Sequence, residues 1–454
     1  MKRNKLYQCV LGAVLALLPL AYQANAATVD DPAVMDRISH SRMLPITMSN
    51  PLDSGTLLFS DSPEYADKDG ILYGDEVNGD CRLYFYHVNQ SNLPKKIVVM
   101  AYNPTEEPAE VIIKGCQYAR PSQSYYDVGK ELSTMYYEGL NTVNKVLVQP
   151  HNYALLGERL DKVVVQPADL FSGIVDFSLP TSMYVSSVIM PVAVDPQVFI
   201  RRQIYLPSDS VQLRGTFRGM NRDLHNLVSF TPADGIGYVK IADGLVDRFL
   251  EGRDVMDNRI SENTGNYGVD YSVRLRTKGQ GNLHLYFNPQ GGEYAGVAEV
   301  IYPDGRNGDG KNIDDKKIVE LPRNRLSMGY NDPYAMEYID SFKAGSTVIV
   351  HLMPPGAANL PIRLLVVPDQ QLEQAAKEAA ELQKLKDSAR NMSTPDWLHN
   401  GSSANTIGTT AVISAAPQQQ AEQTKNSKKK KQKKNDSDAD TEHTYTPWHP
   451  KTVI

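Results

Sequence analysis

The side chains that most often build metal sites are scattered along this chain. Nine histidines are present, and no two of them show the His-x-His or His-x-x-x-His spacing that suits a shared metal ion. His87, His284 and His351 each fall within an expected strand, where a locally hydrogen-bonded histidine is the simplest interpretation. The cysteines are too few for a zinc site. The sequence therefore predicts no metal ligands and no cofactor.

Two acidic, glycine-bearing segments are candidates for calcium loops, at residues 67–70 and 304–310. Neither has the alternating oxygen ligands and the closing Glu of an EF-hand, and Asp-Gly pairs are also ordinary hairpin turns. Turns are the favoured interpretation. The chain also lacks a Gly-x-Ser-x-Gly elbow and a phosphate-binding glycine loop. Acidic residues are plentiful, but nothing in the sequence selects a working pair, so no catalytic residues are predicted.

Sugar binding is a less specific possibility. Sugar sites commonly stack aromatic rings on the sugar faces, so the aromatic residues are the ones to consider. Trp397 and Trp448 both lie beyond the expected folded body. Four tyrosines of one segment are the alternative: Tyr125, Tyr126, Tyr136 and Tyr137. The simpler interpretation is that these rings pack their segment onto the β body, and both interpretations stay open.

A lysine run near the end of the sequence is the clearest candidate for binding a polyanion. It consists of Lys428, Lys429, Lys430, Lys431, Lys433 and Lys434. A segment of this charge attracts anionic polymers or lipids with salt-sensitive affinity. The alternative is a solubilising tail that has no partner. The whole chain carries −6, residues 1–26 carry +3 and residues 421–454 carry +3, so residues 27–420 carry −12. An acidic body argues against a nucleic-acid-binding face.

The first residues predict export. Lys2, Arg3 and Lys5 precede an apolar stretch, and Ala24-Asn25-Ala26 supplies the small residues that a signal peptidase reads. Residues 1–26 are therefore expected to be a signal peptide, which places the protein in the periplasm or at the cell surface. The apolar stretch is shorter than the ~20 residues that a helix needs to span a bilayer.

The elements that must position any site are mostly strands. Residues 27–44 are expected to be a polar lead-in, followed by two β-sandwich-like (Ig-like) domains at 45–198 and 199–368, because short strands alternate with turn signals. The clearest strand is 269–276, in which Val269, Tyr271, Val273 and Leu275 share one face. Other expected strands of the first domain include 82–88, 97–102, 163–165, 174–177 and 185–190. Residues 118–142 are expected to form a short helix or an ordered loop.

Beyond the second domain the composition changes. Asp369 can cap a helix, and residues 369–392 are expected to form one, with Leu372, Ala375, Ala379 and Leu382 as a narrow apolar stripe. A solvated or docked single helix is favoured over a coiled coil. Residues 393–454 are expected to be a disordered tail, basic and then acidic.

Cys9 lies in the expected signal peptide, so Cys81 and Cys116 are the cysteines of the mature chain. Whether these two form a disulfide is left open by the sequence. An oxidising compartment would allow the bond. In a simple meander their strand ends lie roughly 25 Å apart at ~3.3 Å per residue, too far for a bond that needs Cα atoms within about 7 Å. A sandwich could bring the two strand ends together. The fold is not expected to depend on this pair.

Three segments carry a family resemblance: 84–90 (YFYHVNQ), 265–269 (GNYGV) and 288–296 (NPQGGEYAG). They resemble secreted bacterial proteins labelled copper-amine-oxidase-like, over roughly residues 45–368. The resemblance implies export and a β fold. It does not imply copper chemistry, because copper amine oxidases form their cofactor from a Tyr in Thr-x-x-Asn-Tyr-Asp/Glu. Here Thr264 stands one position too close to Asn266-Tyr267, Gly268 follows, and no His-x-His is present.

Three functions remain consistent with the sequence. The first is an exported, non-enzymatic envelope protein that binds a surface polymer or a protein partner through its β body, with the lysine tail adding electrostatic contact. The second is an exported hydrolase or oxidoreductase whose site is assembled from distant residues. The third is an envelope assembly or structural factor that acts through the helix at 369–392.

Overall fold

Twenty strands dominate the part of the chain that the computed structural model describes, which is residues 29–139, 143–308, 310–312 and 314–392. The strands are β1 (Met43–Pro45), β2 (Leu52–Ser60), β3 (Tyr65–Ala66), β4 (Gly70–Asn89), β5 (Lys95–Tyr102), β6 (Ala109–Tyr118), β7 (Asn144–Val148), β8 (Tyr153–Leu155), β9 (Leu170–Pro191), β10 (Arg214–His225), β11 (Ile236–Ile241), β12 (Leu250–Asp254), β13 (Arg259–Asn263), β14 (Asp270–Arg276), β15 (Asn282–Pro289), β16 (Gly296–Tyr302), β17 (Asp315–Leu321), β18 (Glu337–Lys343), β19 (Thr347–Leu352) and β20 (Ile362–Pro368). The helices are α1 (Pro32–Ser39), α2 (Tyr125–Glu138), α3 (Pro196–Phe199) and α4 (Asp369–Met392), with short 3-10 turns η1 (Leu160–Lys162), η2 (Ile200–Arg202) and η3 (Pro232–Asp234). The expected mainly β fold is confirmed.

Two long strands organise the first half of the chain. β4 and β9 pair antiparallel along nearly their whole lengths, with register shifts near Ile71 and Val77. β5 pairs with one end of β9 and β6 with the other, while β2 pairs with β4. Register shifts bend strands. The β4–β9 pair therefore contributes to two layers of the fold. The core between these layers includes Tyr73, Phe85 and Phe177.

In the second half, two sheets face one another across a shared core. The five-stranded sheet has the order β1-β11-β20-β15-β18, and the 15-stranded sheet includes β17-β16-β19-β14-β10 before it continues into β2, β4 and β9. The predicted inward face of 269–276 is confirmed, because Val269, Tyr271, Val273 and Leu275 are fully buried in this core.

The expected boundary at residue 198 does not coincide with a break between sheets. β10 pairs antiparallel with β2, so strands from both sides of that boundary belong to the 15-stranded sheet. The chain divides instead into two compact units at Lys384 and Leu385. The division into two Ig-like domains is therefore not confirmed.

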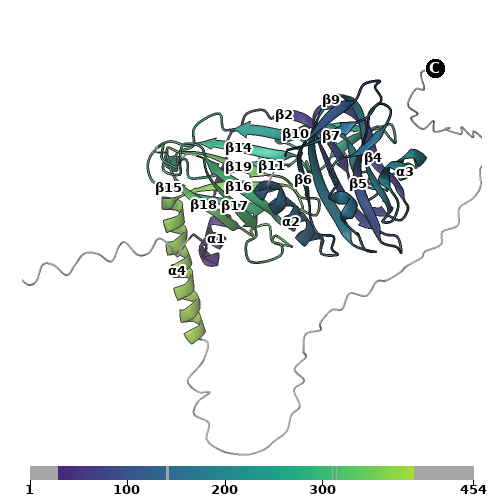
Figure 1. Cartoon of the computed structure of the whole chain (residues 1–454). Coiled ribbons are helices and arrows are strands. Elements are labelled where there is room, and N and C mark those ends of the chain that lie inside the picture. Colours follow the sequence, from purple (N-terminus) through teal and green to yellow (C-terminus); the bar gives the residue numbers. More distant parts are fainter. Residues whose placement is uncertain (1–28, 140–142, 309, 313, 393–454) are drawn as a thin grey trace, which may run out of the picture. The chain divides into compact units, whose positions relative to one another are not determined.

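The inserted segment after β6 forms α2, which packs between the two halves of the 15-stranded sheet. Its buried residues are Val128, Gly129, Leu132, Ser133 and Tyr137, and they cover about half of the helix circumference. The helix contacts β6 and β9 from the first half and β16 and β17 from the second, an arrangement visible in Figure 1. The helix thus lies at the junction where residues from both halves meet.

Helices also cover the outer face of the five-stranded sheet. The expected helix 369–392 is confirmed as α4, and Leu372 and Ala375 from its apolar stripe pack on this face. α1 packs in the same cluster through Val34 and Ile38. The polar lead-in therefore contains a helix, which begins after Asp31 because its carboxylate accepts the Ala33 N–H and Pro32 fills the first helical position.

Two further details of the predicted elements differ from the structure. The strand expected at 163–165 is wrong: the chain leaves η1 there and makes a single bridge, between Val165 and Lys95. The turn η1 before this segment and Pro167 after it leave no room for a ladder. The segments 174–177 and 185–190, expected as two strands, both belong to β9.

Cys81 and Cys116 are free. They lie on β4 and β6, which pair with β9 at Phe177 and Val175. Two strand spacings of ~4.8 Å separate the two cysteines, about 10 Å and beyond disulfide reach. The prediction that the fold does not depend on this bond agrees with that placement, although the meander distance of ~25 Å was an overestimate.

Candidate functional site

A polar hollow of about 340 Å³ opens where α2 meets both halves of the 15-stranded sheet. It is called the polar cleft below. Its lining combines two tyrosines, three carboxylates, a histidine and other polar groups. These residues are Tyr136, Tyr137, Asp176, Asp270, Glu299, His351, Lys114, Lys316 and Gln117, with Gly115 and Gly139. The volume falls at the lower end of the range for small-molecule sites.

Behind the cleft, Arg82 of β4 is buried with every guanidinium donor engaged. Its Nε and Nη2 donate to the two carboxylate oxygens of Asp176 at 2.7 and 2.8 Å. Its Nη1 donates to the carbonyls of Met220 and Gly268, and Nη2 also donates to the Tyr136 hydroxyl at 2.5 Å. The guanidinium carbon lies 5.0 Å from the centre of the Tyr136 ring. One side chain therefore fixes both the Asp176 carboxylate and the Tyr136 ring that line the cleft.

Asp270 at the start of β14 links α2 to the sheet. The Tyr137 hydroxyl donates to Asp270 Oδ1 at 2.9 Å, and His351 Nδ1 lies 3.7 Å from Oδ2. Burial disfavours the charged imidazole, but hydrogen bonding to Asp270 and the negative charges of Asp270, Glu299 and Asp223 together raise the pKa of His351. The site thus favours a protonated histidine surrounded by carboxylates from three strands.

The tyrosines of the cleft are neutral hydrogen-bonding groups. Burial, followed by the charge of Asp270, raises the pKa of Tyr137 well above its usual value, and burial likewise raises that of Tyr136. Their rings meet edge to face with centres 5.1 Å apart. They line the cleft as neutral aromatic groups rather than as phenolate nucleophiles.

Two lysines stand at the rim and are tied to carboxylates. Lys316 Nζ lies 3.2 Å from Glu299, and Lys114 Nζ lies 2.6 Å from Asp80. Both ammonium groups are exposed, whereas the Glu299 side chain is 13% exposed. The cleft therefore has charged hydrogen-bonding groups of both signs, already oriented by partners.

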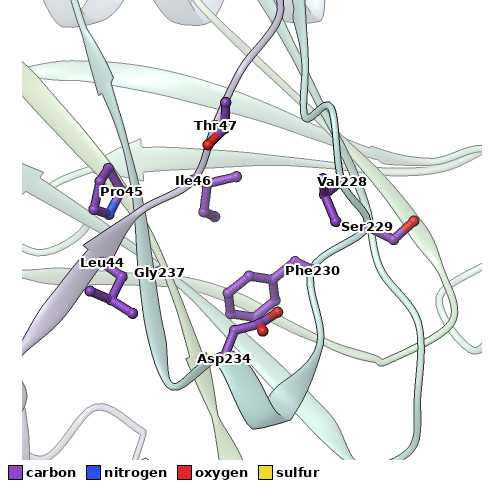
Figure 2. A pocket seen from close by; sticks show the side chains of 9 residues that line it. All are labelled: Leu44, Pro45, Ile46, Thr47, Val228, Ser229, Phe230, Asp234 and Gly237. Carbon is purple, nitrogen blue, oxygen red and sulfur yellow. The ribbon is translucent and has the colours of Figure 1, made fainter.

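A second hollow, of about 250 Å³, lies beside the edge strand β1 and is mainly apolar (Figure 2). Ile46, Val228 and Phe230 line it together with Leu44. Asp234 is the ionisable residue among the described residues of this lining, and its carboxylate accepts the N–H and hydroxyl of Thr231 in a cap. This hollow offers apolar contact but little chemistry.

Of the tyrosines singled out in the sequence, the structure brings Tyr136 and Tyr137 together in the polar cleft. Tyr125 and Tyr126, at the start of α2, lie elsewhere: Tyr125 packs edge to face on Tyr86, and Tyr126 interacts with Glu293. None of the described residues of the acidic loops 67–70 and 304–310 lines the cleft. The lysine run 428–434 lies outside the described residues.

The histidines expected to bond locally follow that expectation in part. His87 is fully buried between the Ser60 hydroxyl and the Pro63 carbonyl, each 2.8 Å away. His284 bonds to Ser341 and Asp369. His351 lines the polar cleft instead.

Arg82, Asp176 and Glu299 were not foreseen as site residues. Arg82 and Asp176 each stand in an otherwise apolar stretch of an expected strand, and a charge in such a stretch must find a partner. That signal marks both residues as unusual but does not identify either one as the other's partner.

Among the described residues, no three histidine, cysteine or acidic side chains gather in a way that would hold a metal ion. In the same part of the chain no helix combines the length and apolarity needed to cross a membrane. No family model matches the chain, and comparison with curated proteins found no match either.

Proposed function

We propose that this protein is an exported envelope protein that binds a glycan unit of a surface polymer in the polar cleft, and that the cleft itself performs no catalysis. The observation that carries the proposal is the lining itself. The aromatic residues Tyr136 and Tyr137 line a hollow of about 340 Å³ beside carboxylates and ammonium groups. A sugar has apolar C–H faces and a rim of hydroxyls that both donate and accept hydrogen bonds, and this mixture of groups matches it.

Prior orientation of the lining supports tight binding. Asp176 is held by Arg82, Asp270 by Tyr137, and Glu299 by Lys316. Groups that are already fixed lose little conformational freedom when a ligand arrives. Each of these carboxylates has a donor or a cation beside it, and its remaining lone pairs are available to accept hydrogen bonds from ligand hydroxyls.

Export and surface attachment are part of this proposal. They are supported by the signal-peptide pattern of residues 1–26, by the acidic charge of residues 27–420 and by the lysine run 428–434. The resemblance to secreted copper-amine-oxidase-like proteins points the same way. An Ig-like division into two domains is likewise proposed. One hydrophobic core of the β body consists almost entirely of residues before 199, which supports the division, whereas the other core draws on residues from both sides of that boundary.

Co-sedimentation with isolated cell envelopes tests this function. The mature protein and a form truncated after Pro368 are compared at low and high salt, because salt screens the contribution of the lysine run. Both forms should pellet at high salt, and Glu299→Gln should weaken that salt-resistant fraction, whereas Glu251→Gln, at an exposed position of β12, should not. If neither form pellets at high salt, the β body has no specific polymer site.

A further inference from the structure

A serine, a histidine and an aspartate line up on the outer face of the five-stranded sheet. Ser341 Oγ on β18 lies 2.7 Å from His284 Nδ1 on β15. His284 Nε2 lies 2.7 Å from Oδ1 of Asp369, the first residue of α4. These residues are 57 and 85 positions apart in the sequence. The polar cleft lies at the 15-stranded sheet, and Ser341, His284 and Asp369 are not among the residues that line it.

The directions of these hydrogen bonds follow from donor and acceptor chemistry. The Asp369 carboxylate can only accept, so Nε2 of a neutral His284 must carry the proton that bonds to it. Nδ1 is then a bare acceptor, and the Ser341 hydroxyl must donate to it. The Tyr338 hydroxyl, 2.6 Å from Ser341 Oγ, must in turn donate to the serine oxygen. A serine that donates to an imidazole, which donates to a carboxylate, is the arrangement that activates a nucleophile.

Asp369 is itself held in place. Its Oδ2 accepts the backbone N–H of Asn282 at 3.2 Å and the Asn282 side-chain amide at 2.8 Å. Its Oδ1 remains directed at His284. The carboxylate therefore fixes both the tautomer and the orientation of the imidazole, which is the role of the acidic member of such a triad.

Accessibility separates this group from the other serine–histidine pair of the fold. Ser60 and His87 are 2.8 Å apart but are both fully buried, so no substrate can reach them. Ser341 is partly exposed on the edge strand β18, and the Asp369 side chain is 31% exposed, while His284 is 6% exposed beneath them. Ser341 is thus partly exposed, whereas the histidine that would act as its base is buried.

The backbone of Ser341 offers a donor at the same place. Lys343, two residues later, directs its N–H away from β15 to the Arg306 carbonyl. Alternate residues of a strand point their N–H groups to the same side, so the Ser341 N–H also points outward from the free edge. The nucleophile's own N–H is a standard contributor to stabilising a developing oxyanion.

We propose that Ser341, His284 and Asp369 form a catalytic centre that hydrolyses carboxylic esters. Ser341 Oγ bonds to the ester carbonyl carbon as its proton passes to His284 Nδ1, and the carbon–alkoxide bond then breaks as the alkoxide takes that proton and leaves as an alcohol. Water next attacks the acyl-serine, gives a proton to His284, and releases the carboxylic acid as Ser341 regains its proton. Asp369 stays ionised throughout. This inference does not rest on glycan binding in the polar cleft.

A fluorophosphonate probe tests the proposal on the full mature chain. The fluorophosphonate should form one covalent adduct, located on Ser341 by peptide mapping, and this result does not depend on whether any variant folds. Ser341→Ala should abolish the adduct, and Ser54→Ala at an exposed position of β2 should leave it unchanged. Asp369→Asn should slow labelling at least about tenfold, because the imidazole loses its fixed tautomer.

Hydrolysis of p-nitrophenyl acetate gives a second readout that should follow the same order across these variants. An adduct on Ser341 together with ester turnover that is lost in Ser341→Ala supports the centre. If the wild-type protein takes no label, or if labelling and turnover persist in Ser341→Ala, the three residues only anchor α4 to the sheet and the proposal is overturned.

Discussion

Arg82 and Asp176 form a two-point ion pair across β4 and β9, with contacts of 2.7 and 2.8 Å, at the point where α2 joins the halves of the 15-stranded sheet. The Arg82 side chain is 1% exposed and that of Asp176 is 15% exposed. The carboxylate on the cleft side and the guanidinium on the core side thus connect the stability of the fold to the shape of the polar cleft.

Replacing Arg82 with Lys should destabilise the protein markedly. A lysine has three donors on one atom and cannot reproduce the fork that binds Asp176, Tyr136 and two backbone carbonyls. We expect the free energy of unfolding to fall by about 3 kcal/mol, the scale for breaking a buried ion pair. Urea denaturation measures this change. Arg274→Lys, at an exposed position of β14, is the matched control and should change it by less than about 0.5 kcal/mol.

The pH dependence of stability should report on His87. Burial is the main cause that lowers its pKa to about 4, below the value of about 6.5 for an unfolded chain. The unfolded chain therefore binds a proton first as the pH falls. Stability that is fully present above pH 6.5 is lost progressively toward pH 4, about 3 kcal/mol in all.

Urea denaturation at pH 7 and pH 5 tests this linkage. His87→Gln should be less stable than the wild-type protein at pH 7, and that difference should shrink by about 2 kcal/mol at pH 5. A difference for His87→Gln that is equal at both pH values would contradict the assignment.

His351 should titrate above the usual range for histidine. Burial opposes its charge, but Asp270, Glu299 and Asp223 favour it more strongly. Its imidazole resonance in an NMR titration should therefore show a midpoint above about 6.5. Asp270→Asn should lower that midpoint, since it removes the carboxylate 3.7 Å away. A midpoint that does not respond to Asp270→Asn would mean that the carboxylate has no such influence.

Two leucines of α4 provide a matched test of how the helix attaches. Leu372 is 5% exposed in the cluster with α1, whereas Leu385 is 67% exposed. Leu372→Ala should lower the free energy of unfolding by about 2 to 3 kcal/mol through lost burial and a cavity. Leu385→Ala should leave it nearly unchanged in the same urea experiment. Equal effects of the two substitutions would show that the apolar stripe does not dock on the sheet.

Local patterns in the sequence predicted the individual strands and helices better than they predicted which elements pair with one another. The alternation of Val269, Tyr271, Val273 and Leu275 predicted both the strand and its buried face, because a period of two is a local property. The composition of 369–392 predicted α4 for the same reason. The segment 163–165 failed because three valines favour a strand only where a neighbouring strand can pair with them.

The sequence did not predict the polar cleft; it only named Tyr136 and Tyr137 among four tyrosines that could stack on a sugar. Asp176 lies 94 positions from Arg82, and the Tyr137–Asp270 contact spans 133 positions. Such pairs depend on how bent strands bring distant segments together, which no local pattern records. Ser341, His284 and Asp369 were missed for the same reason, since each has a sufficient local interpretation as a strand residue or a helix cap.

The most direct test of glycan binding is an NMR titration of the mature protein with solubilised envelope glycan at high salt. Resonances of His351, Tyr136 and Tyr137 should shift saturably, and Glu299→Gln should weaken the apparent affinity severalfold while Glu251→Gln does not. If the protein pellets with envelopes but these three resonances do not move, the polymer binds elsewhere and the polar cleft is not the binding site.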